Sequence, residues 1–190
     1  MSAFNLPNLL TYGRIAAVPV VVACFTLPEL PTDGSRWVAF GLFVVAAITD
    51  FFDGYLARAW QQQSALGRML DPIADKLLVA AILLVLVDAR TIAGSTVIAA
   101  VIILCREILV SGLREFLAEL RVSVPVTWLA KWKTTAQLVS VGFLIAGPAG
   151  DKLLPGTTVI GILLLWISAL VTLYTGWDYF RAGIRHLIEE

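Results

Sequence analysis

The chain has 190 residues, of which 59% are hydrophobic and 15% are charged, and its mean hydropathy is +0.87. Soluble domains are typically about 45–50% apolar and about 25% charged, so this composition indicates a protein whose solvent is lipid. The formal net charge at pH 7 is zero, which leaves no bulk electrostatic attraction to nucleic acid, and no nucleic-acid partner is expected.

Six apolar stretches, separated by breaks rich in polar residues, Pro or Gly, are each close to the length of about 20 residues that crosses a bilayer core. We therefore expect an all-α polytopic membrane protein that forms a single membrane-embedded domain over residues 1–190. The expected transmembrane helices cover about residues 9–28, 36–57, 66–87, 92–117, 126–147 and 156–180.

Basic residues are distributed unevenly between the two sides of this predicted bundle. Six spans place both termini on one side, and every Lys and Arg except Arg36, Arg90 and Lys152 belongs to that side. Because cytoplasmic loops carry the excess of Lys and Arg, we expect the termini to lie in the cytoplasm.

The fourth expected span carries a polar face. At about 100° per residue, Glu107, Ser111 and Arg114 fall within a narrow arc, and Arg106 and Glu115 flank it. Charges that face lipid are very costly, so this face is expected to point into the bundle or into a hydrated cavity.

Four aspartates stand at helical spacings on either side of the break between the second and third spans. Asp50 and Asp53 are three residues apart, and Asp71 and Asp75 are four apart, so each pair shares one helix face. A hairpin of the two helices brings the carboxylates together, where they repel one another unless a cation lies among them. Oxygen ligands without a matching His or Cys suit Mg²⁺ or Mn²⁺, and four carboxylates can hold two such ions. Two ions would bridge a diphosphate and stabilise charge on its leaving group.

Two further residues share the face of the first aspartate pair. Gly54 removes a side chain where a bulky group must approach the backbone, and Arg58 offers a planar fork suited to phosphate. A single pair of aspartates could be a packing feature. Four aspartates together with Gly54 and Arg58 at these spacings favour a functional site.

Pro72 leaves the start of the third helix open. If the helix begins near Ser64, a suitable N-cap, Pro72 lies inside it and kinks it close to the aspartates. If the helix begins at Asp71, Pro72 takes its first position.

These residues match, position for position, the signature D-x-x-D-G-x-x-A-R-x8-G-x-x-x-D-x-x-x-D, and the chain resembles the CDP-alcohol phosphatidyltransferase family. The matching positions are Asp50, Asp53, Gly54, Ala57, Arg58, Gly67, Asp71 and Asp75. The resemblance implies a six-helix membrane fold, a metal-dependent phosphatidyltransferase that uses CDP-diacylglycerol, and a homodimer.

The resemblance also implies roles for individual residues. The metal ligands would be Asp50, Asp53, Asp71 and Asp75, with Mg²⁺ or Mn²⁺ as the cofactor. Asp75 would also be the catalytic general base that takes the proton of the incoming alcohol, whose oxygen then attacks the β-phosphorus and releases CMP. The residues expected to contact the CDP portion of the donor are Asn8, Thr11, Gly54, Arg58, Ser64 and Gly67.

Motifs outside the signature indicate the acceptor. Residues 7–14, the Arg106-Glu107-Ile108 triplet and residues 131–137 look like the corresponding segments of the bacterial phosphatidylglycerophosphate synthases. Those enzymes transfer phosphatidyl to sn-glycerol 3-phosphate. This resemblance implies an integral protein of the bacterial inner membrane with its active site facing the cytoplasm.

An anionic acceptor also suits the basic residues. Arg106, Arg114 and Lys131 are expected to form a pocket for the acceptor phosphate. Lys131 and Lys133 lie about 200° apart on a helix, so at most one faces the pocket well, and we favour Lys131. Alternatively, the two arginines only pair with neighbouring glutamates and fasten the helices.

Three other interpretations stay open at this point. A sister enzyme of the same family would share the signature and use inositol phosphate, serine or phosphatidylglycerol as its acceptor. A divalent-cation transporter would also place acids in membrane helices, although here no second acidic cluster marks an exit. A non-catalytic membrane scaffold would not need Gly54 together with Arg58.

Overall fold

The computed structural model describes the backbone of residues 6–27, 32–59, 65–119 and 128–188. Within these ranges the description leaves out some side chains, those of residues 6, 7, 32, 51–59, 65, 66, 68, 119, 128–131, 178 and 182–188. The described part consists of six helices and contains no strand, which confirms the predicted all-α fold class. The helices are α1 (Leu6–Thr26), α2 (Thr32–Ala59), α3 (Ala65–Asp88), α4 (Thr96–Glu119), α5 (Trp128–Asp151) and α6 (Thr157–Ile188).

Three of these helices are long and apolar enough to cross a membrane. The qualifying segments are Asn8–Thr26 in α1, Thr96–Ala118 in α4 and Thr157–Arg181 in α6. Large apolar side chains on their outer faces, such as Leu163 and Leu170, are more than half exposed, as is usual for helices whose solvent is lipid.

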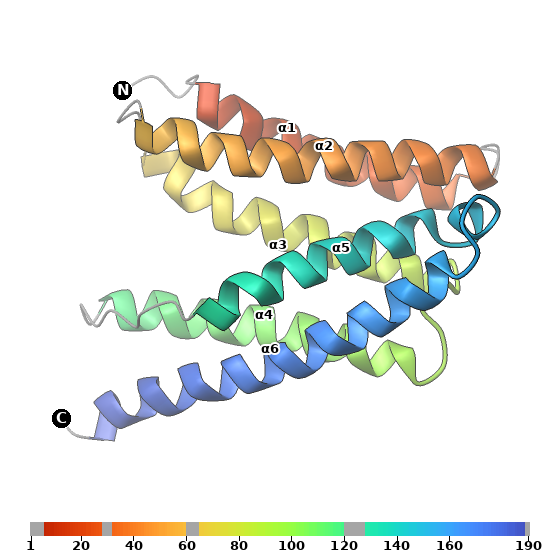
Figure 1. The fold of residues 1–190 in the computed structure, drawn as a ribbon. Coiled ribbons are helices and arrows are strands. Elements are labelled where there is room, and N and C mark those ends of the chain that lie inside the picture. Colours follow the sequence, from red (N-terminus) through yellow and green to blue (C-terminus); the bar gives the residue numbers. More distant parts are fainter. Residues whose placement is uncertain (1–5, 28–31, 60–64, 120–127, 189–190) are drawn as a thin grey trace.

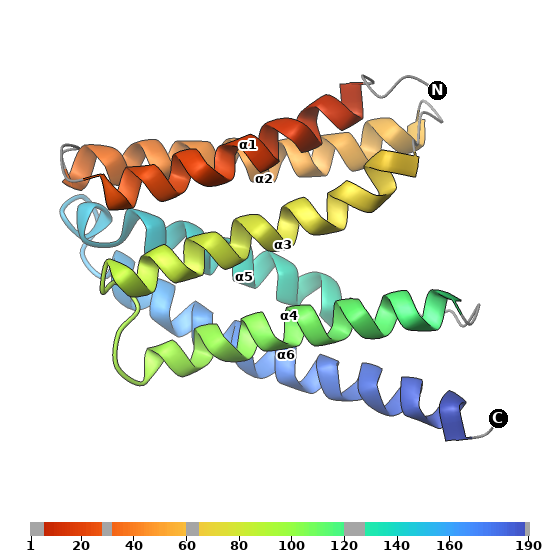
Figure 2. The same cartoon turned by 180° about the vertical axis from the view of Figure 1, so that it is seen from behind.

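The bundle has two groups of three helices (Figure 1). Helix α1 packs against α2 and α3, and α6 packs against α4 and α5. Helix α5 joins the two groups through contacts with α2 and α3, and in the view from behind it crosses between α3 and α6 (Figure 2). Because consecutive helices run in opposite directions, α1 begins and α6 ends at the same end of the bundle (Figure 1). We call this the terminal end, and the aspartates and the charged residues of α4 lie on the halves of their helices nearest to it.

Pro72 lies inside α3, because this helix begins at Ala65 rather than at Asp71. The first of the two alternatives for Pro72 is therefore the one that the structure supports. A proline inside a helix removes one backbone hydrogen bond and frees the carbonyl four residues earlier, here that of Arg68, less than one turn before Asp71.

The opposite end of the bundle is fastened by a buried arginine. The guanidinium of Arg36 in α2 donates hydrogen bonds to the carbonyl oxygen of Ile145 at 3.1 Å and to the hydroxyl of Thr91 at 2.7 Å. Gly147 adopts φ 43°, and a Cβ added there would lie 2.6 Å from Arg36 Nη1. Glycine is therefore required at this kink of α5, both for its backbone conformation and for the approach of the arginine.

Candidate active site

Arg14 of α1 joins two of the predicted metal ligands. Its Nη1 lies 2.7 Å from Asp50 Oδ1 of α2 and 2.5 Å from Asp75 Oδ1 of α3. The arginine side chain is 1% exposed, whereas those of Asp50 and Asp75 are 42% and 47% exposed. The two carboxylates thus meet at one buried cation and keep open sides that face the cavity described below.

The third described aspartate is held by the same helix α1. The hydroxyl of Thr11 donates a hydrogen bond to Asp71 Oδ1 at 2.6 Å. Asn8 and Thr11 are buried and lie three residues apart, and Arg14 follows after three more, so these residues form a polar edge of α1 toward α3. Gly67, another predicted donor contact, is buried in the first turn of α3.

Several predicted site residues lie outside the described side chains: Asp53, Gly54, Arg58, Ser64 and Lys131. Among the described residues, no three Asp, Glu, His or Cys side chains are close enough to hold a metal ion. The donor chemistry nevertheless fits a hard divalent cation, because Asp50, Asp71 and Asp75 offer only oxygen ligands around one small region.

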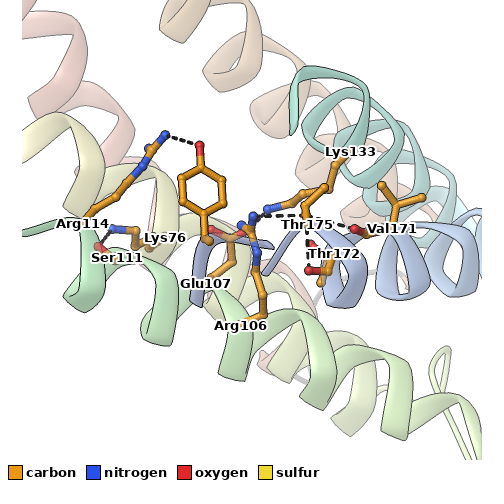
Figure 3. A network of polar contacts seen from close by, with 10 residues as sticks. Lys76, Arg106, Glu107, Ser111, Arg114, Lys133, Val171, Thr172 and Thr175 are labelled. Carbon is orange, nitrogen blue, oxygen red and sulfur yellow. Dashed lines mark hydrogen bonds and ion pairs between the residues drawn. The ribbon is translucent and has the colours of Figure 1, made fainter. Parts of the chain in front are cut away.

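A second polar cluster lies between α4 and α5 (Figure 3). Glu107 Oε1 accepts from Arg106 Nη1 at 3.2 Å and also forms an ion pair with Lys133. The side chain of Lys133 is only 4% exposed and that of Arg106 11%, so both cations are removed from bulk water. The structure therefore brings Lys133 to the predicted basic pocket, whereas the side chain of Lys131 is not described.

Helix α6 completes this cluster. Arg106 Nη2 lies 3.4 Å from the hydroxyl of Thr175 (Figure 3), and Arg114 Nη2 donates to the hydroxyl of Tyr179 at 3.2 Å. The guanidinium of Arg114 also lies over the Tyr179 ring, 5.4 Å from its centroid. The alternative in which the arginines only pair with glutamates therefore holds for neither residue, because Arg106 contacts Thr175 of α6 as well as Glu107, and Arg114 contacts Tyr179 of α6.

Lys76 links the aspartate-bearing helix to the charged helix. It follows Asp75 directly in α3, and its ammonium donates a hydrogen bond to the hydroxyl of Ser111 in α4 (Figure 3). Because Ser111 lies on the same face of α4 as Glu107 and Arg114, this contact brings the polar face of α4 toward Asp75.

Both clusters line one cavity of about 640 Å³. Its wall includes Arg14, Asp50 and Asp75 from the acidic cluster and Arg106, Arg114 and Lys133 from the basic cluster, together with Tyr179 of α6. The cavity therefore brings the aspartates of the acidic cluster and the cations of the basic cluster to one shared space.

An apolar groove adjoins the cavity. It has a volume of about 490 Å³ between α2 and α5, and its lining includes Phe40, Val139 and Gly142. Phe43, Ala47 and Leu138 line both spaces. The shared residues make the groove an apolar extension of the polar cavity.

Sequence reasoning did not assign roles to Arg14, Lys133 or Tyr179. Arg14 carried a signal, because a charged residue within an apolar helix is a functional candidate by default. Lys133 was one of two candidate lysines for the acceptor-phosphate pocket, but the sequence does not show which face of their helix meets the pocket. Tyr179 had no local signal, since its role depends on the packing of α6 against α4.

The family model for CDP-alcohol phosphatidyltransferase matches residues 4–174. The chain belongs to the CDP-alcohol phosphatidyltransferase family. Together with the three membrane-length helices, this makes it an integral membrane protein.

Members of the family resemble the chain over almost its whole length. A protein of Rickettsia bellii is 46% identical over 94% of this chain and 94% of its own length. One of Shigella flexneri serotype 5b is 40% identical over 98% and 99%. One of Cereibacter sphaeroides is 38% identical over 98% and 99%. All three are named CDP-diacylglycerol–glycerol-3-phosphate 3-phosphatidyltransferase.

Proposed function

We propose that the protein transfers the phosphatidyl group of CDP-diacylglycerol to sn-glycerol 3-phosphate, giving phosphatidylglycerophosphate and CMP in phospholipid biosynthesis. The observation that carries this proposal is the cavity that both the acidic and the basic cluster line. A reaction between a diphosphate donor and an anionic acceptor needs both. The names of the relatives support the same donor and acceptor.

The acidic cluster is the proposed metal site. Mg²⁺ or Mn²⁺, two ions in all, would be held by Asp50, Asp53, Asp71 and Asp75, and would supply positive charge for the diphosphate and for the departing CMP. The contacts of Arg14 and Thr11 keep the described carboxylates oriented. The proposed contacts to the CDP portion are Asn8, Thr11, Gly54, Arg58, Ser64 and Gly67.

The basic cluster is the proposed site of the acceptor phosphate. Arg106, Arg114 and Lys133 supply three cations, and Lys133 takes the place that the sequence had suggested for Lys131. Arg106 Nε is buried and has no hydrogen-bond acceptor among the described residues, so it retains a donor for a phosphate oxygen. An acceptor without a phosphate would leave this donor unpaired.

Asp75 is the proposed general base. One of its oxygens is bound by Arg14, and its side chain is 47% exposed toward the cavity, so it can accept the proton of an acceptor hydroxyl. The resulting oxygen forms a bond to the β-phosphorus as the bond from that phosphorus to the CMP oxygen breaks. Positioning of the two substrates is the main contribution expected of the protein.

The apolar groove between α2 and α5 is the proposed site of a donor acyl chain. Its residues are apolar and it shares Phe43, Ala47 and Leu138 with the cavity, so the diphosphate can lie in the cavity while the chain stays among membrane lipids. The proposed location is the bacterial inner membrane, with the terminal end and the cavity toward the cytoplasm, in agreement with the positive-inside rule. We also propose that the protein forms a homodimer, as members of its family do.

The test is CMP release by detergent-purified protein with CDP-diacylglycerol and Mg²⁺ or Mn²⁺. The acceptors sn-glycerol 3-phosphate, inositol 1-phosphate, serine and phosphatidylglycerol are supplied singly, with Asp75→Asn as the control. The proposal expects release with sn-glycerol 3-phosphate alone and none from the variant. Release with another acceptor would assign a sister activity. No release from folded, metal-supplied protein, together with metal uptake into vesicles, would assign a transporter.

A further inference from the structure

Gln137 lies in the wall of the proposed active-site cavity, and the described part of the chain offers its carbonyl oxygen no hydrogen-bond partner. The residue is 5% exposed and lines the cavity from α5. Its Oε1 is buried and meets no donor among the described residues. Buried polar atoms in native proteins almost always have a partner, so an unpaired one in a substrate cavity indicates a missing ligand group.

Position on the helix relates Gln137 to the basic cluster. Gln137 and Lys133 are four residues apart and share one face of α5, with Gln137 about 6 Å farther from the terminal end. Both line the cavity together with Asp75. A ligand whose phosphate is bound at Lys133 therefore occupies a space that Gln137 and Asp75 also line.

Two other side-chain oxygens in the described residues are buried without a partner. These belong to Ser168 and Thr172 of α6, which do not line the cavity. They provide a comparison, because they share the burial of Gln137 but have no access to a substrate.

The proposed acceptor has one polar group that neither the basic cluster nor Asp75 contacts in the proposed function. The phosphate of sn-glycerol 3-phosphate is bound by the basic cluster, and the reacting primary hydroxyl gives its proton to Asp75. The secondary hydroxyl between them is a hydrogen-bond donor and needs an acceptor once it leaves water.

We infer that Gln137 Oε1 accepts a hydrogen bond from the secondary hydroxyl of the acceptor and so is a specificity-determining residue. This inference rests on the proposed function. A site that hydrogen-bonds a substrate hydroxyl rejects an analogue without it, because the buried group on the protein is then left unpaired. Gln137 thus selects acceptors that carry a hydroxyl on the carbon next to the reacting one.

The experiment compares sn-glycerol 3-phosphate with 3-hydroxypropyl phosphate, which lacks only the secondary hydroxyl. CMP release gives kcat/KM for each acceptor in the wild type and in Gln137→Met, which keeps the length of the side chain and removes its amide. Gln137→Glu keeps an oxygen acceptor at this place. Ser168→Ala removes a buried, unpaired hydroxyl outside the cavity and is the matched control. If Gln137→Met does not fold, Gln137→Leu makes the same test.

The inference expects the wild type to favour sn-glycerol 3-phosphate by about tenfold or more, the ratio for one neutral hydrogen bond. In Gln137→Met this preference should fall to within about twofold, because kcat/KM falls for sn-glycerol 3-phosphate and not for the analogue. Gln137→Glu and Ser168→Ala should keep the wild-type preference. A wild-type preference that persists in Gln137→Met overturns the inference and leaves the proposed function intact. Wild-type protein that uses neither acceptor overturns both.

Discussion

Arg14 Nη1 lies 2.5 Å from Asp75 Oδ1, and the same nitrogen contacts Asp50, so two of the proposed metal ligands share one buried cation. Helix α1 thereby reaches into a site that the sequence signature places on α2 and α3. This relationship makes the stability of the protein depend on the charge balance between Arg14 and the aspartates.

We predict that Arg14→Gln destabilises the metal-free protein. The change leaves Asp50 and Asp75 facing one another without a cation, which costs about 1–3 kcal/mol because both carboxylates are nearly half exposed. Added Mn²⁺ should raise the unfolding temperature of the variant more than that of the wild type, because a bound cation stabilises by linkage. Equal shifts in the two proteins would contradict this prediction. Unfolding temperatures in detergent, with EDTA and with Mn²⁺, are the measurement.

We predict that Lys133→Met raises the KM for sn-glycerol 3-phosphate by about 10- to 100-fold, the loss of one charged hydrogen bond. The KM for CDP-diacylglycerol should stay near its wild-type value, because Lys133 lies in the basic cluster and not among the aspartates. Lys131→Met tests the lysine that the sequence favoured, and Lys152→Met, exposed at the other end, is the control. A larger effect from Lys131→Met would return the assignment to that residue.

We predict that Gly147→Ala lowers stability by about 1–3 kcal/mol, the usual cost of a strained backbone conformation, with a further loss from collision with Arg36. Gly94→Ala is a matched control for the backbone alone, since Gly94 has φ 58° and nothing lies within 4 Å of the added Cβ. Thermal unfolding of the two variants should therefore show a larger loss for Gly147→Ala. Equal losses would mean that the contact with Arg36 adds nothing.

We predict a pH-dependent contribution from Asp151, which lies in the connection between the fifth and sixth predicted spans. Its Oδ1 accepts from the amide of Thr158 at 3.0 Å and its Oδ2 from the hydroxyl at 2.5 Å, and these bonds hold the pKa of Asp151 below its usual range. The stabilisation is present above the unfolded pKa of about 3.9 and is lost as pH falls through the lower folded pKa.

The measurement is the unfolding temperature of wild type and Asp151→Asn between about pH 6 and pH 3. The difference between the two proteins should narrow as pH falls through the folded pKa. Thr158→Val removes the hydroxyl donor and keeps the amide donor. Its unfolding temperature should therefore differ less from that of the wild type, with the same pH trend. A difference that stays constant with pH would rule out ionisation of Asp151 as its source.

The six helices and their order could be predicted from the sequence because lipid imposes a length and an apolar composition on each span. The polar face of α4 was also predictable, since Glu107, Ser111 and Arg114 must avoid lipid together, and the structure directs them to one cavity. In both cases a local pattern carries the information, so no knowledge of neighbouring helices is needed.

The partners of these residues could not be predicted. That Glu107 pairs with Lys133 and Arg114 with Tyr179 depends on how α5 and α6 rotate against α4, and no spacing within one helix records that rotation. The unpaired oxygen of Gln137 is visible only after the cavity has been assembled from all its walls. The kink at Gly147 was predictable only as the end of a span, because the contact with Arg36 joins residues more than 100 positions apart.

The residues shared by the apolar groove and the polar cavity have a consequence for the energetics of turnover. In the proposed arrangement a lipid keeps its hydrocarbon tails among apolar side chains while only its headgroup is exchanged. Pulling such tails into water would cost about 0.8 kcal/mol for each methylene group, a barrier of tens of kcal/mol for two chains. A sideways opening removes that barrier, so substrate and product lipids can arrive and depart by diffusion in the plane of the bilayer.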